Sequence, residues 1–286
     1  MKLLLVGGFL GAGKTTLISK LLPSMEGMGM RLALIENEFG EQSIDSATLS
    51  EHQLSITGIS GGCVCCQLVG NLISALAEIE EEIDPNWCII ELSGMAVTAN
   101  TLTALRQYYR PDLQVLSIVA VDAQRWKKLQ RIAGPRVQAQ LTGADAVFLS
   151  KLDLCTELPE VDCTIPKLQR IGEVLELITG FQGGQELCQL SAVEEPWVEA
   201  EAMHRRVTFH ETAEKQAIIE KMRALILEAG QGVVIDGIIP GHIKGIACMD
   251  GGSITASMTV MGQVNISDLC KTEKTNGYSI DIYTLK

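Results

Sequence analysis

Residues near the N-terminus have the types and the spacing of a phosphate-binding loop. The segment Gly8–Thr15 fits the pattern G-x-x-x-x-G-K-[ST] between an apolar run and a helical pattern, which is the context that this motif requires. Gly8, Gly11 and Gly13 allow the backbone to turn its N–H groups, with that of Ala12, toward phosphate oxygens at a helix N-terminus. The segment predicts a nucleotide site rather than a tight turn without a ligand.

Charged and hydroxyl side chains complete this predicted site. Lys14 is expected to bind the β- and γ-phosphates and to act in catalysis, the Thr15 hydroxyl to bind Mg²⁺, and Thr16 to contact the α-phosphate. Glu91 leaves an apolar strand and is the second predicted catalytic residue, because a carboxylate there can hold Mg²⁺ through water or orient the attacking water. Gly94 allows close backbone approach to the γ-phosphate. The other interpretation of Glu91 is a carboxylate that caps a helix or faces solvent.

The segment Ser150-Lys151-Leu152-Asp153 bears on the choice of base. A carboxylate at Asp153 can accept hydrogen bonds from N1–H and N2–H₂ of guanine, whereas adenine offers no such pair of donors. The stem of Lys151 can pack beside the ring. The segment resembles the Asn-Lys-x-Asp signature of GTPases, with Ser150 in place of asparagine. We therefore expect GTP rather than ATP.

Three cysteines lie close together at Cys63, Cys65 and Cys66, in a glycine-flanked loop between a strand and a helix. Thiolates bind zinc and other soft or borderline metals, and a zinc site short of thiols must recruit another ligand. Glu36 and Glu41, which follow the second expected strand of the chain, Arg31–Ile35, are the predicted additional ligands. The same cysteines can instead be buried apolar residues, a redox pair or the ligands of a purely structural ion.

The elements that must position these residues form an α/β pattern. Apolar runs alternate with helical patterns over the first two-thirds of the chain, which predicts a doubly wound, mostly parallel sheet. The expected strands are Leu3–Val6, Arg31–Ile35, Gln53–Thr57, Trp87–Ile90, Val115–Val121 and Ala146–Leu149. The expected helices are Lys14–Leu22, Gln67–Ile83, Thr98–Tyr109 and Ala123–Ile132, with Pro23, Pro85 and Pro111 just beyond helix ends.

A second, smaller α+β domain is expected after this pattern weakens. The predicted boundaries are a P-loop GTPase domain over 1–181, a linker over 182–202 and a C-terminal domain over 203–286. The first domain is expected to end with a strand at Val174–Thr179. In the second domain, the expected strands are Arg206–His210, Val233–Ile238, Ile243–Met249, Ser253–Val260 and Ile280–Tyr283, and the expected helix is Thr212–Glu228. The turn Asp250-Gly251-Gly252 predicts a hairpin between the third and fourth of these strands.

Composition excludes several classes of function. Among 286 residues, acidic side chains outnumber basic ones by 35 to 23, and the formal charge of −12 argues against nucleic acid or an anionic membrane as the main partner. The apolar run Lys2–Val6 is too short for a signal peptide, and no apolar stretch reaches the roughly 18–20 residues of a membrane span. Nine cysteines without a secretory signal predict a reducing, cytoplasmic location rather than a disulfide framework.

Taken together, four blocks resemble the CobW-like GTPases, relatives of the urease and hydrogenase nickel-insertion GTPases. The blocks are Gly8–Thr16, Glu36–Glu41, Gly62–Cys66 and Glu91–Gly94, and they occur in the order of that family. The resemblance covers residues 1–180 and implies a GTP-hydrolysing metallochaperone or metal insertase. It also implies that Glu36–Glu41 is a switch segment and that the cysteine loop holds the transferred ion, which hydrolysis releases to a client protein or metal-cofactor pathway.

The resemblance leaves the metal, the client and the oligomeric state open. Zinc is the first expectation for the transition metal, with cobalt or nickel as alternatives, and the client can be a zinc, nickel or corrinoid-dependent enzyme. Related GTPases often pair across their nucleotide faces, so a homodimer is one of the oligomeric states left open. No arginine finger can be identified, which predicts slow intrinsic hydrolysis of GTP to GDP and phosphate.

Two departures from the family pattern and three alternatives complete the prediction. Ser150 replaces the usual asparagine, and His204, His210 and His242 are scattered instead of forming a metal-storing tract. Asp122 resembles a Val-Asp position of the family, but it can equally cap the helix that follows. The alternatives are a GTP-dependent interaction switch with a structural zinc, a P-loop kinase of a small molecule, and a thiol oxidoreductase.

Overall fold

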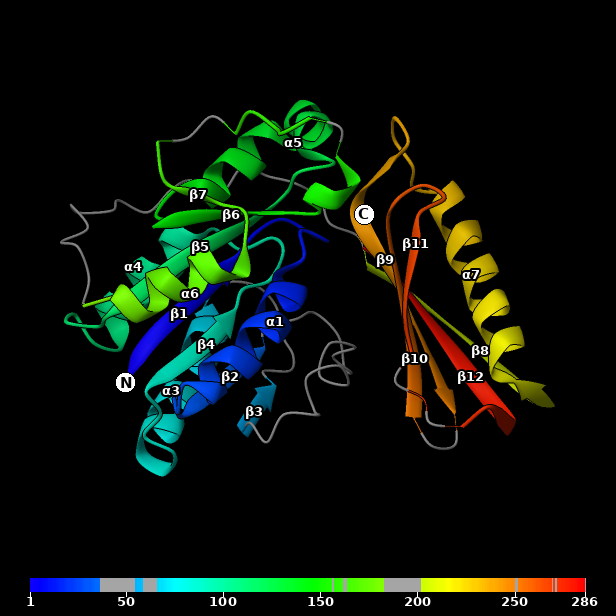
Figure 1. Ribbon diagram of the computed structural model, residues 1–286, viewed down its shortest axis with the longest axis horizontal. Coiled ribbons are helices and arrows are strands. Elements are labelled where there is room, and N and C mark those ends of the chain that lie inside the picture. The colour runs from blue at the N-terminus through cyan, green and yellow to red at the C-terminus, as the bar shows by residue number, and fades with distance from the viewer. Residues whose placement is uncertain are drawn as a thin grey trace. The chain divides into compact units, whose positions relative to one another are not determined.

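The computed structural model divides into two compact units, Met1–Trp197 and Val198–Lys286 (Figure 1). It describes residues 1–36, 55–58, 66–155, 157–161, 164–182, 202–249, 252–268, 270 and 272–285. Most of the predicted linker lies outside these residues, so the domain boundaries stay predictions. No helix in the described ranges is long and apolar enough to cross a membrane.

The first unit is built on a parallel sheet, which confirms the predicted fold class. Over the described residues this sheet has seven strands in the order β3-β2-β4-β1-β5-β6-β7. The strands are β1 (Lys2–Gly7), β2 (Leu32–Glu36), β3 (Ser55–Gly58), β4 (Trp87–Glu91), β5 (Val115–Asp122), β6 (Ala146–Ser150) and β7 (Lys167–Leu168). Strands β1, β2, β4, β5 and β6 are almost continuously buried, because helices cover both faces of the sheet.

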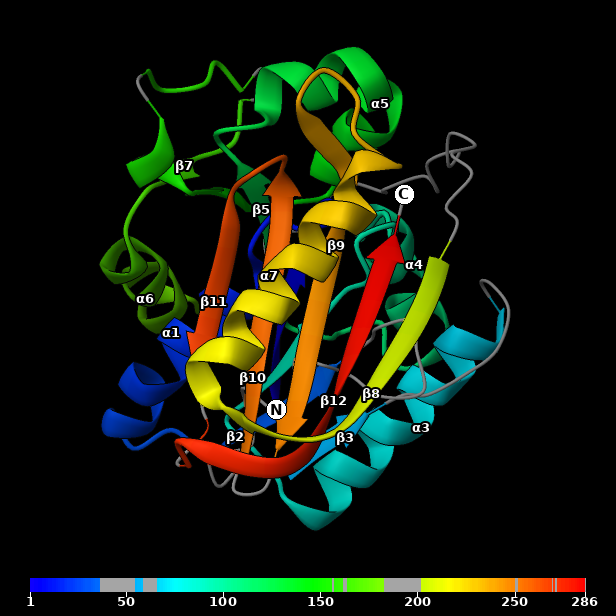
Figure 2. The same cartoon turned by 90° about the vertical axis from the view of Figure 1, so that its right-hand side faces the viewer.

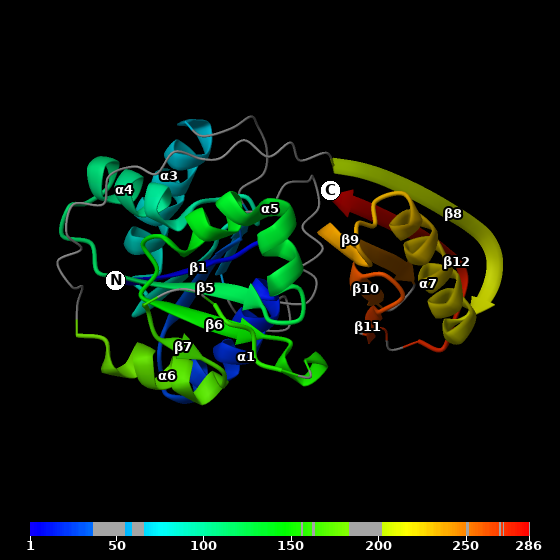
Figure 3. The same cartoon turned by 90° about the horizontal axis from the view of Figure 1, so that it is seen from above.

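Helices pack on both faces of this sheet (Figure 3). Helices α1 (Lys14–Gly27) and α6 (Ile171–Gly180) bury Leu17, Leu21 and Val174 in one apolar cluster with β1, β2 and β4. On the opposite face, α3 (Cys66–Glu82) and α4 (Thr98–Tyr108) bury Leu76 and Leu102. The other helical segments among the described residues of this unit are α5 (Trp126–Leu141) and the short η1 (Leu152–Leu154).

The second unit is an antiparallel sheet with one helix, α7 (Lys215–Gln231), over one face (Figure 2). The strands in the described residues follow the order β11-β10-β9-β12-β8. Ile218, Met222 and Ile226 of α7 pack on the apolar side chains of that face. The strands are β8 (Ala202–Glu214), β9 (Ile238–Met249), β10 (Gly252–Val260), β11 (Val264–Asp268) and β12 (Lys274–Leu285). The expected hairpin is present, since Met249 pairs with Gly252, whereas β11 was not predicted.

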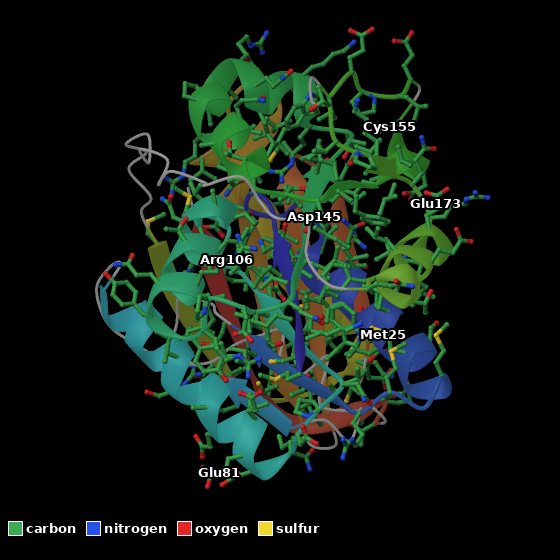
Figure 4. The ribbon with its side chains drawn as sticks, turned by 90° about the vertical axis from the view of Figure 1, so that its left-hand side faces the viewer. Met25, Glu81, Arg106, Asp145, Cys155 and Glu173 are labelled. Carbon is green, nitrogen blue, oxygen red and sulfur yellow. The ribbon has the colours of Figure 1, made fainter. Side chains whose placement is uncertain are left out.

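The strand predicted at Val174–Thr179 is wrong, because these residues belong to α6. Val174 and Ile178 are buried four residues apart, which is the spacing of one helix face. The carboxylate of Glu173, labelled in Figure 4, accepts the N–H groups of Gln169 and Arg170 at 2.7 and 3.2 Å. These hydrogen bonds satisfy free donors at the start of the helix and lower the pKa of Glu173.

The strand predicted at Val233–Ile238 is also wrong. Ile235 and Ile238 form an isolated pair around a two-residue turn, with N–H···O distances of 2.8 and 3.0 Å. Asp236 and Gly237 occupy the turn with φ of 52° and 78°, as a type I′ turn requires. The Asp-Gly pair was therefore the stronger signal than the β-branched run around it.

In the described helices, two prolines lie inside the helix, Pro23 in α1 and Pro135 in α5. Helix α1 continues through Pro23 to Gly27, so Pro23 does not mark its end as predicted. Helix α5 begins at Trp126, later than expected, and continues past Pro135 with a kink at Ala133, where φ and ψ are −133° and 31°. Pro135 provides no N–H for the preceding turn, which explains an interruption at this point.

Candidate functional site

The phosphate loop connects β1 to α1, and its glycines adopt backbone angles that other residues avoid. Gly8, Gly11 and Gly13 have φ of 134°, 69° and 88°. A Cβ atom on Gly8 would lie 2.3 Å from the carbonyl oxygen of Ala120 on β5, so no larger residue fits there. The loop can therefore approach the sheet and turn its N–H groups outward at the start of α1.

Lys14 and Thr15 begin α1 and face the loop and β4. The Lys14 side chain is buried, and its ammonium group donates to the carbonyl of Gly8 at 3.2 Å, which holds it across the loop. The Thr15 hydroxyl donates to Glu91, at 2.9 Å from Oε1 and 3.1 Å from Oε2. Thr16 is exposed. A lysine charge, a hydroxyl and a carboxylate thus meet at the helix N-terminus.

Glu91 has an acidic neighbour, Glu36, on the adjacent strand. It ends β4, and its Cα pairs in register with that of Glu36 at the end of β2. Both side chains are buried, with exposed fractions of 9% for Glu91 and 4% for Glu36. The sheet therefore places Glu36, a predicted transition-metal ligand, beside Glu91, the predicted catalytic carboxylate. Among the predicted transition-metal ligands, Glu36 is the one whose side chain the structure describes.

Ser150 ends β6 on the other side of the phosphate loop. Its hydroxyl lies 2.7 Å from the carbonyl oxygen of Ala12 and 3.1 Å from that of Val121. The serine thus connects the loop to β5 and β6. Lys151 follows with a left-handed φ of 57°, and Asp153 lies exposed in η1. Of the three residues predicted to contact the base, Ser150 thus touches the phosphate loop, Lys151 pairs with Asp122, and Asp153 is exposed to solvent.

A buried ion cluster lies next to this segment. The Asp122 carboxylate is 2.7 Å from the Nε of Arg125 and 2.7 Å from the Nζ of Lys151. Burial opposes ionisation of Asp122, but these two cations outweigh it and lower the pKa of the carboxyl group. Asp122 also accepts the N–H of Arg125 at 3.0 Å, but α5 begins only at Trp126 with Arg125 as its N-cap residue, so the alternative interpretation of Asp122 as a helix cap is wrong.

The loop after β4 is held by side chains of α5. Gln140 Nε2 donates to the carbonyl oxygens of Gly94 at 2.7 Å and Ala96 at 3.3 Å, and Arg136 donates to that of Met95. Gln140 and Arg136 are both buried. Three consecutive carbonyl groups of the loop that contains Gly94 are thereby fixed.

The remaining predicted metal ligands lie largely outside the described residues. Glu41, Cys63 and Cys65 are not among these residues, and of Cys66 only the backbone, at the first position of α3, is described. Within the described ranges, no group of three or more His, Cys, Asp or Glu side chains is close enough to hold an ion. Burial raises the pKa of Cys88 to about 12, so this core thiol is protonated at neutral pH.

Arg125, Arg136 and Gln140 were not predicted from the sequence. The spacing of Asp122 and Arg125 directly after a strand could have indicated their ion pair. Nothing in the sequence indicates the contacts of Arg136 and Gln140 with the Gly94 loop, because they join segments that are far apart in the chain.

Comparison with known proteins identifies the family of this chain. Residues 2–177 match the nucleotide-binding domain described as CobW/HypB/UreG. The chain belongs to this family. Among CobW/HypB/UreG relatives, the zinc chaperone YjiA of Escherichia coli is 31% identical over 223 residues, which cover 74% of this chain and 67% of YjiA. The zinc chaperone CobW of Sinorhizobium is 31% identical over 182 residues, 52% of this chain and 50% of that protein.

A solved structure of a CobW/HypB/UreG relative also aligns with the chain. It is a zinc-bound triple mutant of the YjiA GTPase, with 17% identity, coverage of 100% of this chain and 94% of that protein, and a TM-score of 0.40. The family resemblance inferred from the four sequence blocks is confirmed by the match over residues 2–177.

Proposed function

We propose that this chain is a GTP-hydrolysing metallochaperone. In this proposal the phosphate loop binds GTP with Mg²⁺, and the loop with Cys63, Cys65 and Cys66 binds a transition metal together with Glu36 and Glu41. The metal is cargo, which the protein transfers to a client under control of the bound nucleotide. Membership of the CobW/HypB/UreG family supports the GTPase part of this proposal.

One observation carries the link between nucleotide and metal. Thr15, predicted to bind Mg²⁺, donates to Glu91, and Glu91 is the register partner of Glu36. A γ-phosphate would change the contacts of Thr15 and Glu91. Glu91 lies on the strand next to that of Glu36, which is a predicted metal ligand. Nucleotide state can therefore change metal affinity through a short path.

The donor set at the helix N-terminus fits Mg²⁺, which prefers oxygen ligands and is often bound by one or two carboxylates together with substrate phosphates. Thr15 and Glu91 are the residues that would hold it, and the bound ion would neutralise charge on the phosphates. Lys14 binds the β- and γ-phosphates, and Glu91 orients water for attack. The backbone N–H of Gly94 approaches the γ-phosphate.

Guanine is the proposed base, bound by Asp153 with Lys151 beside the ring. Ser150 does not contact the base in this proposal; its hydroxyl supports the phosphate loop through Ala12. Replacement of Asp153 by asparagine should therefore lower GTP affinity and raise affinity for xanthosine triphosphate, because the amide can donate to a xanthine carbonyl. An unchanged preference would exclude Asp153 as the guanine ligand.

Zinc is the proposed cargo, since the curated relatives YjiA and CobW are named zinc chaperones. Cobalt and nickel remain alternatives, because thiolate and carboxylate ligands accept all three ions. The client is a metalloprotein or a component of a metal-cofactor pathway. A homodimer and a cytoplasmic location also stay proposals.

Zinc affinity measured in three nucleotide states tests the proposal. Competition with a chromophoric chelator should give different dissociation constants with a non-hydrolysable GTP analogue, with GDP and without nucleotide. Equal constants would reject nucleotide-controlled delivery and favour a structural zinc. Chromatography of the reaction products distinguishes free phosphate from a phosphorylated small molecule, which would indicate a kinase.

The cysteine loop is tested by Cys65→Ser, with Cys248→Ser as its control. Cys248 is an exposed, free thiol of the second unit. Cys65→Ser should weaken zinc binding and leave GTP binding nearly unchanged, whereas Cys248→Ser should change neither. Equal zinc affinities of the two variants would remove the cysteine loop from the metal site. Nucleotide-independent dithiol–disulfide cycling at Cys65 would instead indicate an oxidoreductase.

A further inference from the structure

Helix α5 reaches the phosphate loop at its N-terminal end. The Arg125 side chain, directly before the helix, is fully buried, and its Nη2 donates to the carbonyl oxygen of Leu10 at 2.6 Å. Asp122 holds the same guanidinium group at 2.7 Å, which fixes its direction. A buried, charge-assisted hydrogen bond of this kind is strong and geometrically specific. Arg125 therefore fixes the position of Leu10 within the loop.

The other end of α5 reaches the loop after β4. Gln140 is 1% exposed, and its amide donates to the carbonyl oxygen of Gly94 at 2.7 Å. Gly94 in turn packs directly against Leu10, because a Cβ on Gly94 would lie 2.2 Å from Leu10 Cδ2 and 2.9 Å from its Cα. Leu10, Gly94 and α5 thus form a closed ring of contacts, with Arg125 and Gln140 as its two links.

The helix between these two links is not continuous. Ala133 departs from helical angles two residues before Pro135, so α5 consists of two helical halves. The first half follows Arg125, and the second carries Gln140. A cavity of about 10 Å³, close to the minimum size for one water molecule, is lined by Phe9 and Ala12 of the loop and by Trp126 and Gln140 of the helix.

We propose that Arg125 and Gln140 are positioning residues that hold Leu10 of the phosphate loop against Gly94 through the two halves of α5. This inference rests on the proposed function, in which the Gly94 N–H approaches the γ-phosphate. While both links are in place, Gly94 stays at a fixed distance from the phosphate loop. The protein then distinguishes GTP from GDP through α5 as well as through groups that touch the nucleotide.

A double-mutant cycle tests this proposal. The variants are Arg125→Met, Gln140→Met and the two combined, which keep side-chain size and remove the donors. The matched controls are Arg131→Met and Gln138→Met, exposed residues of the same types on the same helix. For each protein, we would measure affinity for GDP and for a non-hydrolysable GTP analogue, together with kcat, KM and the thermal midpoint.

Each single variant should reduce the preference for the GTP analogue over GDP by about fivefold or more, which is the size of a typical coupling. The double variant should lose no more than the larger single loss, because both links act on the same Leu10–Gly94 contact. A purely structural role would lower the thermal midpoint and leave the preference unchanged, and that result would overturn the proposal. Independent, multiplying losses would overturn it as well.

Pro135→Ala provides a second test if the buried Arg125→Met variant does not fold. Pro135 is exposed and belongs to neither link, and its removal should restore helical continuity in α5. We expect an altered preference between the GTP analogue and GDP, and an unaltered preference would contradict the proposal. If the wild-type protein bound no guanine nucleotide, the proposed function would fail instead, so the two failures are distinguishable.

Discussion

The two units of the chain differ in how they bury charge. Among the described residues of the first unit, six charged side chains are at most 9% exposed: Lys14, Glu36, Glu91, Asp122, Arg125 and Arg136. In the described part of the second unit, the corresponding set contains Asp281 alone. Asp281 is held across the sheet by Arg206, its partner on β8, at 2.7 and 3.0 Å.

We interpret the charges of the first unit as groups that serve the proposed ligands, and the Arg206–Asp281 pair as one that serves the fold. Removing a charge from water costs several kcal/mol, so a cluster of buried charges needs compensation. In the first unit the charges gather around the phosphate loop and the ends of β2, β4 and β5, where a nucleotide would add further partners. In the second unit, the ion pair of the buried Asp281 with Arg206 joins the neighbouring strands β12 and β8. We therefore expect substitutions in the first set to alter binding and stability, and substitutions in the second to alter stability alone.

The largest effect is expected for Asp122→Asn. It leaves Arg125 and Lys151 without their shared carboxylate, so the free energy of unfolding should fall by about 3–5 kcal/mol in urea denaturation at pH 7. The exposed Asp112 offers the control Asp112→Asn, for which a change within about 0.5 kcal/mol is expected.

The effect of Asp122→Asn on the free energy of unfolding should also depend on pH. The folded-state pKa of Asp122 lies below the value of about 3.9 in unfolded chains, so its stabilisation is fully present above about pH 4 and is lost as the pH falls further. The stability gap between wild type and Asp122→Asn should therefore narrow below about pH 4. A gap that stays constant down to acid unfolding would contradict the assigned ion cluster.

A smaller effect, on binding, is expected for Lys14→Ala. Loss of the charged hydrogen bonds to phosphate should weaken GTP affinity by about 10- to 100-fold, or roughly 1.5–3 kcal/mol, in a fluorescent-nucleotide titration. Zinc affinity without nucleotide should stay unchanged. Lys20→Ala, at an exposed position of the same helix, is the control. Parallel loss of zinc and GTP binding would indicate misfolding rather than a phosphate contact.

In the second unit, Asp281→Asn should lower the free energy of unfolding by about 1–2 kcal/mol, since a buried acceptor is weakened while the half-exposed Arg206 can turn to water. Nucleotide affinity should not change. A loss of GTP affinity at unchanged stability would show that Asp281 affects nucleotide binding, and would contradict the assignment of binding to the buried charges of the first unit alone.

The smallest effect is expected at the surface pair Arg205–Glu228. Both side chains are more than 60% exposed and lie 3.4 Å apart. Arg205→Ala should change the free energy of unfolding by no more than about 0.5 kcal/mol, because water screens such a pair. A cost as large as that of Asp281→Asn would mean that exposure does not separate the two pairs.

The sequence allows the sheet and the phosphate loop to be predicted because local patterns determine both. Apolar runs such as Leu3–Val6 and Trp87–Ile90 are buried from both faces, and the glycines of Gly8–Thr15 occur at fixed offsets. Prediction failed where two local patterns competed. At Val174–Thr179 a β-branched, apolar composition masked helical spacing, and at Val233–Ile238 it masked an Asp-Gly turn.

The supporting residues of the site could not be predicted in the same way. Arg125 contacts Leu10 across 115 residues of chain, and Gln140 contacts Gly94 across 46. Such hydrogen bonds depend on how α5 packs on the sheet, and no local pattern encodes them. The contacts of Ser150 could not be predicted either. In the sequence this residue is only a departure from a guanine-binding motif, whereas in the fold its hydroxyl group donates to carbonyl oxygens of the phosphate loop and of β5.

The position of β1 in the sheet also has a consequence for synthesis of the chain. Leu3 pairs with Cys88 of β4 on one side and with Val115 of β5 on the other, so β1 has neither of these partner strands until much later in synthesis. The phosphate loop rests on the same two strands, since Gly8 contacts Ala120 and Thr15 contacts Glu91. Nucleotide can therefore assist folding only after β5 has been made, and until then an apolar strand must be kept from aggregating.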